Sequence, residues 1–161
     1  MRILALTGLL ALAACDAAPP PDDTLDPARA EAVPRIVDAE AAVASVHVPT
    51  VDPAVMNMAE VDQALGDAPY CVFRYTSEGG PVFATAFEAD GTPIRGVVKL
   101  GGDLVLLEAA AGETAAAYRL EAGSIRIEIM PLADEDRRAT ATFAIGEAMH
   151  AGYGGYHACA E

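Results

Sequence analysis

The chain has few basic residues and no long apolar run. Its 161 residues include 24 acids but only 10 bases, and its formal net charge is −14. Nucleic acids are bound by basic faces, so this balance argues against a nucleic-acid partner. No apolar run reaches the ~18 residues that a transmembrane helix needs, whereas an apolar fraction of 53% excludes a wholly disordered chain. The length allows one domain rather than two large ones.

Motifs for catalysis and metal binding are also missing. Only three serines are present, none of them in a G-x-S-x-G turn, and neither a P-loop nor a G-x-G-x-x-G loop opens a helix. The acidic run 134–136 lacks the spacing of a calcium loop and is interpreted as a solvated turn, and the histidines lack the close pairing and third ligand of a metal site. We therefore expect no catalytic residue, no metal and no cofactor, with an enzyme kept as an alternative. The histidines are His47, His150 and His157.

The first fifteen residues have the pattern of an export signal that ends in a cysteine. Arg2 precedes twelve uncharged, mostly apolar residues, too few to span a membrane as a stable anchor. The stretch ends in Leu12-Ala13-Ala14-Cys15, which resembles the lipobox of bacterial lipoproteins: a leucine, two small residues and a cysteine. The resemblance implies a signal peptide over residues 1–14 and lipidation of Cys15, whose acyl chains would make the membrane a partner. The alternative is an ordinary signal peptide cleaved near Ala13-Ala14, with an incidental cysteine.

Asp16 bears on which membrane holds the protein. In enteric bacteria, an aspartate directly after the lipidated cysteine resembles a signal for retention in the inner membrane. That rule belongs to enteric bacteria, so the choice between the inner and the outer membrane stays open. We expect a cell-envelope protein that is lipid-anchored and faces the periplasm.

A spacer follows the cysteine. Residues 15–32 are rich in Pro, Ala and Asp, and this composition predicts a disordered tether that reaches ~50 Å at ~3.1 Å per residue. Residues 16–69 carry 11 acids and 2 bases, whereas residues 70–161 carry 13 acids and 7 bases. The acidity is therefore concentrated before the main domain.

Residues 33–66 are expected to form a helical lead-in. Pro34 suits the first turn of one helix over 34–46. A second helix is expected over 53–65, with Asp52 as its N-cap and Pro53 in its first turn. Its apolar residues recur at helical spacing and most simply pack on the sheet that follows.

The hydrophobic period changes to two from Tyr70 onward. Ile125, Ile127 and Ile129, for example, alternate with polar residues, which is typical of a half-buried strand. No alternation of strands with helices appears, which argues against a parallel sheet. We predict a mainly β domain over residues 67–161: a small antiparallel β-sandwich or barrel of about eight strands, with the choice between the two left open. The expected strands are 70–76, 82–87, 94–100, 103–108, 113–120, 124–129, 138–145 and 153–158.

Two cysteines remain once Cys15 is set aside. Cys71 lies in the first expected strand and Cys159 beside the last. An even pair in an exported chain favours a disulfide, which would pin the two ends of the sheet together. The alternative is a reactive thiol, because His157 lies two residues from Cys159 and would point to the same face of the strand.

The most unusual stretch is Gly-rich and aromatic. It reads Ala-Gly-Tyr-Gly-Gly-Tyr-His and contains Tyr153, Tyr156 and His157, which are candidate ligand-facing residues. Glycines allow close backbone approach, and tyrosines offer rigid amphipathic surface. The alternative is a bulged or twisted terminal strand whose tyrosines cover the end of the sheet.

Three patterns in the second half resemble a group of uncharacterised envelope lipoproteins of Gram-negative bacteria. They are P-Y-C-V-F-R-Y-T-x-x-G-x-P-V-F, V-V-K-L-G-G-D-L-V-L-L and G-Y-x-x-Y-x-A-C, and the resemblance covers residues 55–160. It implies a compact β domain with no known activity. The architecture is also similar to periplasmic inhibitors of c-type lysozyme, and an acidic domain suits a basic lysozyme. The Ser-Gly-x-x-Tyr inhibitory loop of that family is absent from this chain.

The sequence thus leads to a lipid-anchored envelope protein. We expect a non-catalytic binding or structural module, with an envelope protein as a possible partner. The alternatives are an inhibitor of c-type lysozyme and an enzyme whose reaction the sequence does not indicate.

Overall fold

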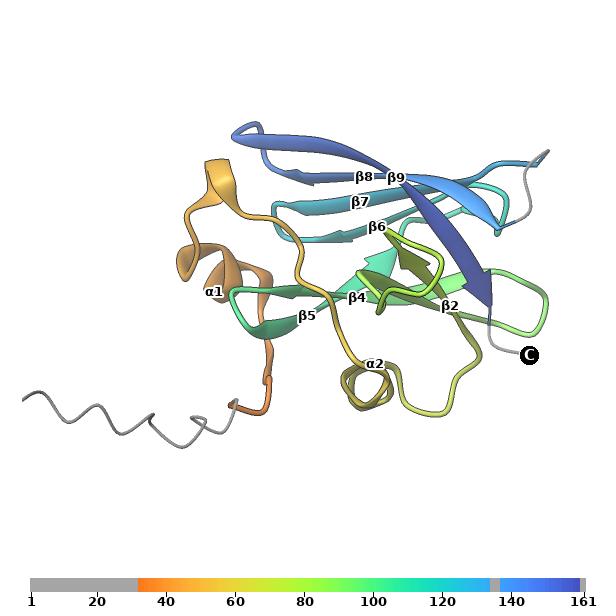
Figure 1. The fold of residues 1–161 in the computed structure, drawn as a ribbon, viewed down its shortest axis with the longest axis horizontal. Helices are drawn as coiled ribbons and strands as arrows, with labels where there is room; N and C mark the ends of the chain where they lie inside the picture. The colour runs from red at the N-terminus through yellow and green to blue at the C-terminus, as the bar shows by residue number, and fades with distance from the viewer. Residues whose placement is uncertain (1–31, 134–136, 160–161) are drawn as a thin grey trace, which may run out of the picture. The chain divides into compact units, whose positions relative to one another are not determined.

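The computed structural model describes residues 32–133 and 137–159 (Figure 1). The chain divides into two compact units, Met1–Ala32 and Val33–Glu161, and every element described below belongs to the second. The expected signal peptide, Cys15, nearly all of the expected tether and the acidic run 134–136 lie outside the described residues. No described helix is long and apolar enough to cross a membrane.

Eight strands form a closed antiparallel barrel, so the expected mainly β fold is confirmed and the barrel is the form it takes. The strands follow the order β5-β4-β3-β2-β9-β8-β7-β6, and β6 pairs with β5 to close the ring. A closed barrel leaves no free sheet edge. The strands are β2 (Tyr70–Arg74), β3 (Phe83–Phe87), β4 (Pro93–Leu100), β5 (Asp103–Ala109), β6 (Tyr118–Ala122), β7 (Ile125–Pro131), β8 (Arg138–Ile145) and β9 (Met149–Cys159).

Two strands start four or more residues away from the expected position, whereas the other boundaries differ by two residues or fewer. The strand expected over 113–120 begins only at Tyr118, because the alanine-rich residues before it are exposed and offer no apolar alternation to bury. The strand expected over 153–158 begins earlier, at Met149, and pairs with β8 and then with β2. Ladder hydrogen bonds to these neighbours hold its glycines in extended conformation despite their low strand propensity.

The helical lead-in is shorter and more broken than expected. Ile36–Val37 forms a short strand, β1, parallel to β5, so the first helix, α1 (Ala39–Ala44), begins later than residue 34. A 3-10 turn, η1 (Val48–Thr50), follows it.

The second helix, α2 (Met58–Leu65), begins five residues after the expected start. Asn57 and Glu60 form a capping box: the Asn57 side chain accepts from the Glu60 backbone N–H at 2.9 Å, and the Glu60 carboxylate accepts from the Asn57 N–H at 2.9 Å. This reciprocal pair outcompetes Asp52-Pro53 as a helix start. The Ala54 N–H instead donates to the carbonyl of Lys99 on β4.

Apolar side chains fill the barrel and also cover part of its outer wall. The interior holds three fully buried phenylalanines, Phe73, Phe83 and Phe143, so the barrel is packed rather than hollow. On the outside, α2 packs against the face of β2 to β5, as expected of its apolar stripe (Figure 1). The residues of this second core are Met56, Val61, Ala64, Leu65, Val72, Ala84, Ala86, Val97 and Leu104.

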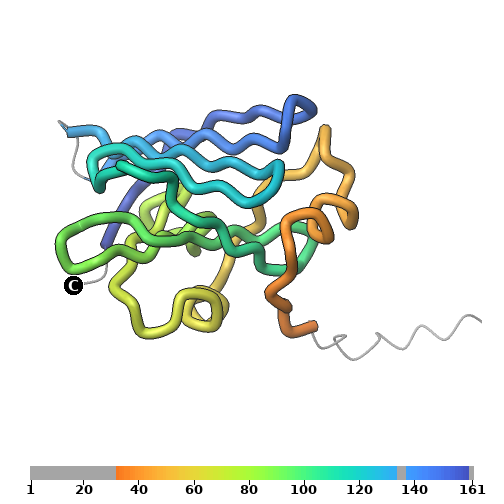
Figure 2. Tube along the Cα trace, turned by 180° about the vertical axis from the view of Figure 1, so that it is seen from behind, coloured from red at the N-terminus to blue at the C-terminus, as the bar shows by residue number. Residues whose placement is uncertain are grey.

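The two ends of the barrel are built differently. At the end that we call the closed end, the segment 38–52 packs over the turns at residues 101–102 and 123–124, and Ala39 and Ala42 are buried in the barrel core. The opposite end, which we call the open end, is formed by the loops 66–69, 88–92 and 110–117 and by the outer ends of β2, β7 and β9. Figure 2 shows the segment 38–52 and the C-terminal end of β9 on opposite sides of the barrel.

Candidate binding cavity at the open end

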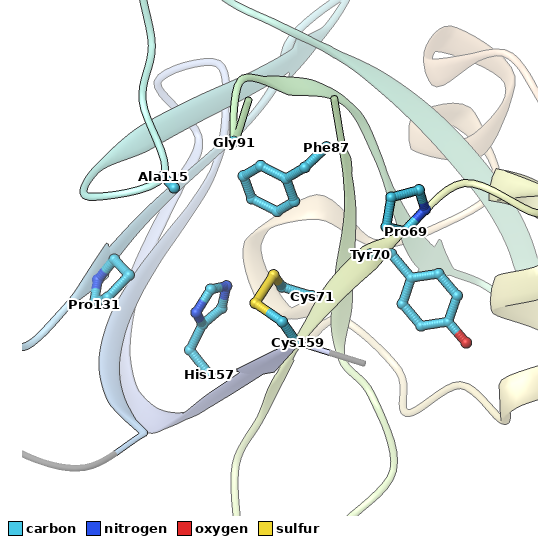
Figure 3. A pocket seen from close by; sticks show the side chains of 9 residues that line it. All are labelled: Pro69, Tyr70, Cys71, Phe87, Gly91, Ala115, Pro131, His157 and Cys159. Atoms are coloured by element: carbon cyan, nitrogen blue, oxygen red, sulfur yellow. A yellow bond between two sulfur atoms is a disulfide. The ribbon is translucent and has the colours of Figure 1, made fainter. Parts of the chain in front are cut away.

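A cavity of about 380 Å³ lies at the open end of the barrel (Figure 3). Its wall is mostly apolar and comes from strand ends and from three loops, so it exists only when the barrel has closed. We call it the end cavity. Its lining residues are Pro69, Tyr70, Cys71, Phe87, Gly91, Ala115, Pro131, His157 and Cys159.

Local sequence features explain the shape of the wall. Gly91 has φ of +86° in the turn after β3, a conformation that L residues rarely adopt. Pro131 ends β7, where its missing N–H leaves no gap in the ladder. The register of β3 and β4 shifts between Ala86 and Phe87, and the Phe87 ring meets the Tyr118 ring edge to face at 5.3 Å between centroids.

The disulfide forms one side of the end cavity. Cys71 and Cys159 are directly opposite each other in the β2–β9 ladder, and their sulfur atoms are bonded, as expected from the sequence. The pair closes a loop with a sequence separation of 88 residues. Because both sulfurs are in the bond, neither Cys71 nor Cys159 offers His157 a free thiol to activate.

A neutral hydrogen bond lies beside the disulfide. The Tyr118 hydroxyl and the His157 Nε2 are 2.9 Å apart. Burial lowers the pKa of His157, which favours the uncharged imidazole. Burial raises the pKa of Tyr118 well above its ordinary value, an effect that the Thr85 side chain partly offsets, so the phenol keeps its proton. The pair therefore brings a polar group to the end cavity without bringing a charge.

His157 is held in place from its backbone as well as from its ring. Its N–H donates to the carbonyl of Arg137 at 2.6 Å, at the point where β8 begins. It pairs in register with Phe73 on β2. The ring therefore belongs to a strand that is fixed on both sides, which suits a binding residue that must not move.

The other two candidate residues of β9 lie elsewhere. Tyr153 is at the closed end, where its hydroxyl donates to Asp52 at 2.9 Å and its ring lies 5.2 Å from that of Tyr75. Burial, the hydrogen bond to Asp52 and the nearby Tyr75 raise the pKa of Tyr153. Tyr156 faces outward, with the Arg138 guanidinium 4.9 Å from its ring centroid. Only His157 of the three lines the end cavity.

One glycine of this stretch has a clear structural role. A Cβ atom on Gly155 would collide with the carbonyl oxygen of Arg74 and with the ring of Phe73. The glycine lets β9 cross close over the packed barrel interior. This agrees with the alternative of a twisted terminal strand, at least for this residue.

Sequence reasoning missed Tyr118 and Phe87. Tyr118 lies 39 residues from His157, and no spacing rule connects the two. The available signal was composition, since Tyr118 is the aromatic residue next to an exposed run of alanines. Only the closed ring of strands brings it to His157.

The chemistry available to the end cavity is binding through one polar contact. Among the lining residues, the Tyr70 hydroxyl is already bonded to Asp62 at 3.1 Å, and the sulfurs are bonded to each other. The imidazole of His157 is the polar side chain that remains. Within the described residues, no group of three His, Cys, Asp or Glu side chains is arranged to hold a metal ion.

Comparison with known proteins gives a single kind of match. Residues 11–161 match a family model described as "Domain of unknown function (DUF6692)". No curated protein and no solved structure matches the chain.

Proposed function

This chain belongs to the DUF6692 family, a domain of unknown function, and we propose that it is a lipid-anchored protein of the cell envelope whose barrel is a non-catalytic binding module. The end cavity is the observation that carries the proposal. It is apolar, it lies at one end of a rigid closed barrel, and its volume of about 380 Å³ falls in the range typical of small-molecule sites.

The anchor is supported by the N-terminal sequence. The Leu12-Ala13-Ala14-Cys15 stretch directly follows an apolar run of signal-peptide length. The acidic lead-in carries a net charge of −9 over residues 16–69, from 11 acids and 2 bases. An anionic membrane surface repels such a segment, which holds the barrel away from the lipid.

Radiolabelled palmitate tests the anchor. The full chain should incorporate the label and remain with the membrane fraction, and Cys15→Ser should lose both properties. Ala18→Ser is the matched control, because it places a serine in the same stretch and should keep the label. Label retained by Cys15→Ser would refute Cys15 as the site of lipidation.

Native mass spectrometry tests the binding module. The Val33–Glu161 unit contains the whole barrel, its core and its disulfide, so it is suited to secretion without the lipid and purification without detergent. We expect it to carry an adduct of defined mass. Ala115→Phe, which fills the end cavity, should lose that adduct, whereas Ala116→Phe on the same loop should keep it. A domain that is free of any adduct and binds no probe would contradict the proposal.

The closed, disulfide-bridged barrel supports a second candidate function, inhibition of c-type lysozyme. It predicts inhibition of c-type lysozyme by the Val33–Glu161 unit at micromolar concentration. Full lysozyme activity under those conditions removes this alternative and leaves the small-molecule proposal intact.

A further inference from the structure

We propose that the end cavity takes a neutral amphiphile: an uncharged molecule with an apolar body and one hydroxyl- or amide-type group that pairs with the free ring nitrogen of His157. The inference rests on the proposed binding function and names the class of its ligand. It follows from what the wall offers, from which polar atoms are already used, and from the charges around the rim.

The wall of the end cavity selects an apolar body. Phe87, Pro69 and Pro131 present ring carbons, and the disulfide presents two polarisable sulfurs (Figure 3). An apolar group that leaves water for such a wall gains about 25 cal/mol per Å² of buried surface. A polar body would lose its hydration there without finding partners.

The free nitrogen of His157 selects one polar group on the ligand. Nε2 is engaged by Tyr118, and Nδ1 has no hydrogen-bond partner among the described residues. A hydroxyl or an amide both donates and accepts, so it pairs with Nδ1 in either tautomer of the neutral ring. The Tyr70 hydroxyl is occupied by Asp62, so the described lining offers a single polar contact.

The charges at the rim argue against an ionic ligand. The described loops of the open end carry Asp67, Glu88, Asp90 and Glu113, but Glu113 forms an ion pair with Arg119 at 3.7 Å, and Arg137 and Arg138 lie at the start of β8. The rim therefore carries charges of both signs, and an anion that entered would find no lysine or arginine in the lining. A cation that entered would find no carboxylate in the lining, and an unpaired charge is costly to bury.

Displacement of a neutral fluorescent probe tests the class of ligand. The Val33–Glu161 unit should bind N-phenyl-1-naphthylamine, an uncharged amphiphile with one N–H group, with a rise in fluorescence. At pH 8, 1-decanol should displace it at concentrations at least tenfold below those needed with decanoate or decyltrimethylammonium, which share the same chain length. Equal displacement by the alcohol and either ion overturns the proposal.

Variants on one loop and one strand locate the site. Ala115→Phe should weaken probe binding at least tenfold, and its neighbour Ala116→Phe should leave binding unchanged, because both residues are exposed but only Ala115 lines the end cavity. His157→Leu should weaken displacement by decanol about tenfold. His150→Leu on the same strand, where the ring is exposed, should not. An unchanged decanol affinity in folded His157→Leu refutes the polar contact.

The outcomes separate this proposal from the one on which it rests. Probe binding that Ala115→Phe abolishes, with no preference among the three decyl compounds, refutes the neutral class and leaves the binding function standing. If His157→Leu does not fold, Tyr118→Phe takes its place. That variant frees Nε2 of its partner and should change the preference for decanol, whereas Tyr156→Phe should not. No probe binding at all refutes both proposals, and palmitate labelling of Cys15 is decided independently of either.

Discussion

The closed end and the open end of the barrel differ in how the apolar interior is covered. At the closed end the chain covers its own core, because Ala39 and Ala42 of α1 are buried against the barrel interior. At the open end, no described helix covers the core, and side chains and a disulfide surround a cavity instead. Burial of apolar side chains stabilises the fold at the closed end, whereas apolar surface at the open end stays available to a ligand.

The links at the two ends also differ in kind. The closed end is joined across the chain by a hydrogen bond from Tyr153 to Asp52, and the open end by a covalent bond between β2 and β9. A hydrogen bond restrains a packed segment that is already in place. A covalent bond holds strand ends that no described helix covers, and so it protects the shape of the end cavity.

Removal of the disulfide should have the largest effect on this contrast. The double variant Cys71→Ala/Cys159→Ala should lose about 4–5 kcal/mol of unfolding free energy in the chain-entropy model, because the bond closes a long loop. Chemical denaturation of the oxidised wild type and the variant measures the loss. A change below about 1 kcal/mol would show that the open end is held by packing alone.

An equal increase in side-chain volume should destabilise the closed end more than the open end, and this is the second-largest effect that we expect. Ala42 is 1% exposed, so Ala42→Leu overpacks the closed end and should cost about 2 kcal/mol. Ala115 is exposed, so Ala115→Leu should change stability by less than about 0.5 kcal/mol. Similar midpoints in urea for the two variants would remove the distinction between the ends.

Loss of a hydroxyl tests the link at the closed end. Tyr153→Phe removes the hydrogen bond to Asp52 and should cost about 1 kcal/mol. Tyr156→Phe is the control, since its hydroxyl has no hydrogen-bond partner among the described residues and its ring stays over Arg138. Equal thermal midpoints for the two variants would contradict a role for Asp52 in closing this end.

The smallest expected effect is a pH dependence that belongs to the open end. Burial lowers the pKa of folded His157 below its ordinary value of 6.5, so the unfolded state binds a proton first as the pH falls. Stability should be unaffected by this group above about pH 7 and should decrease as the pH falls below 6.5, until the folded ring is also protonated. Denaturation midpoints between pH 7.5 and 5 should fall less steeply in His157→Gln than in the wild type, and exposed His150→Gln should keep the wild-type slope.

The strands were predictable because their evidence is local. Alternation alone located β7, whose Ile125, Ile127 and Ile129 are all buried in the barrel core. The predicted start of α2 was wrong because Asp52-Pro53 has the local features of a helix N-terminus. The observed N-terminus is the capping box of Asn57 and Glu60, which is stabilised by a residue outside the helix. The Glu60 carboxylate also accepts from Lys99 on β4, at 2.6 Å. Burial raises the pKa of Glu60, but the hydrogen bonds from Lys99 and Asn57 outweigh it and lower the value overall.

The candidate site was predictable only in part. The sequence predicted the pairing of Cys71 with Cys159, because an exported chain favours disulfides. It also indicated His157, because residues two apart share a face of a strand. Tyr118 did not emerge, because its contact with His157 joins β6 to β9 across the barrel rather than along the chain. Tyr153 and His157 both look ligand-facing in sequence, yet β9 is long enough to carry them to opposite ends.

The short strand β1 determines how a mechanical load would travel through the protein. Ile36–Val37 pairs with only Leu104 and Val105 of β5, directly after the segment that leads to Cys15. If the proposed lipid anchor holds the chain, tension would therefore reach this two-residue ladder before it reached the eight-stranded ring. We expect β1 to separate from β5 under such a force, which would lengthen the linker and leave the barrel and its end cavity intact.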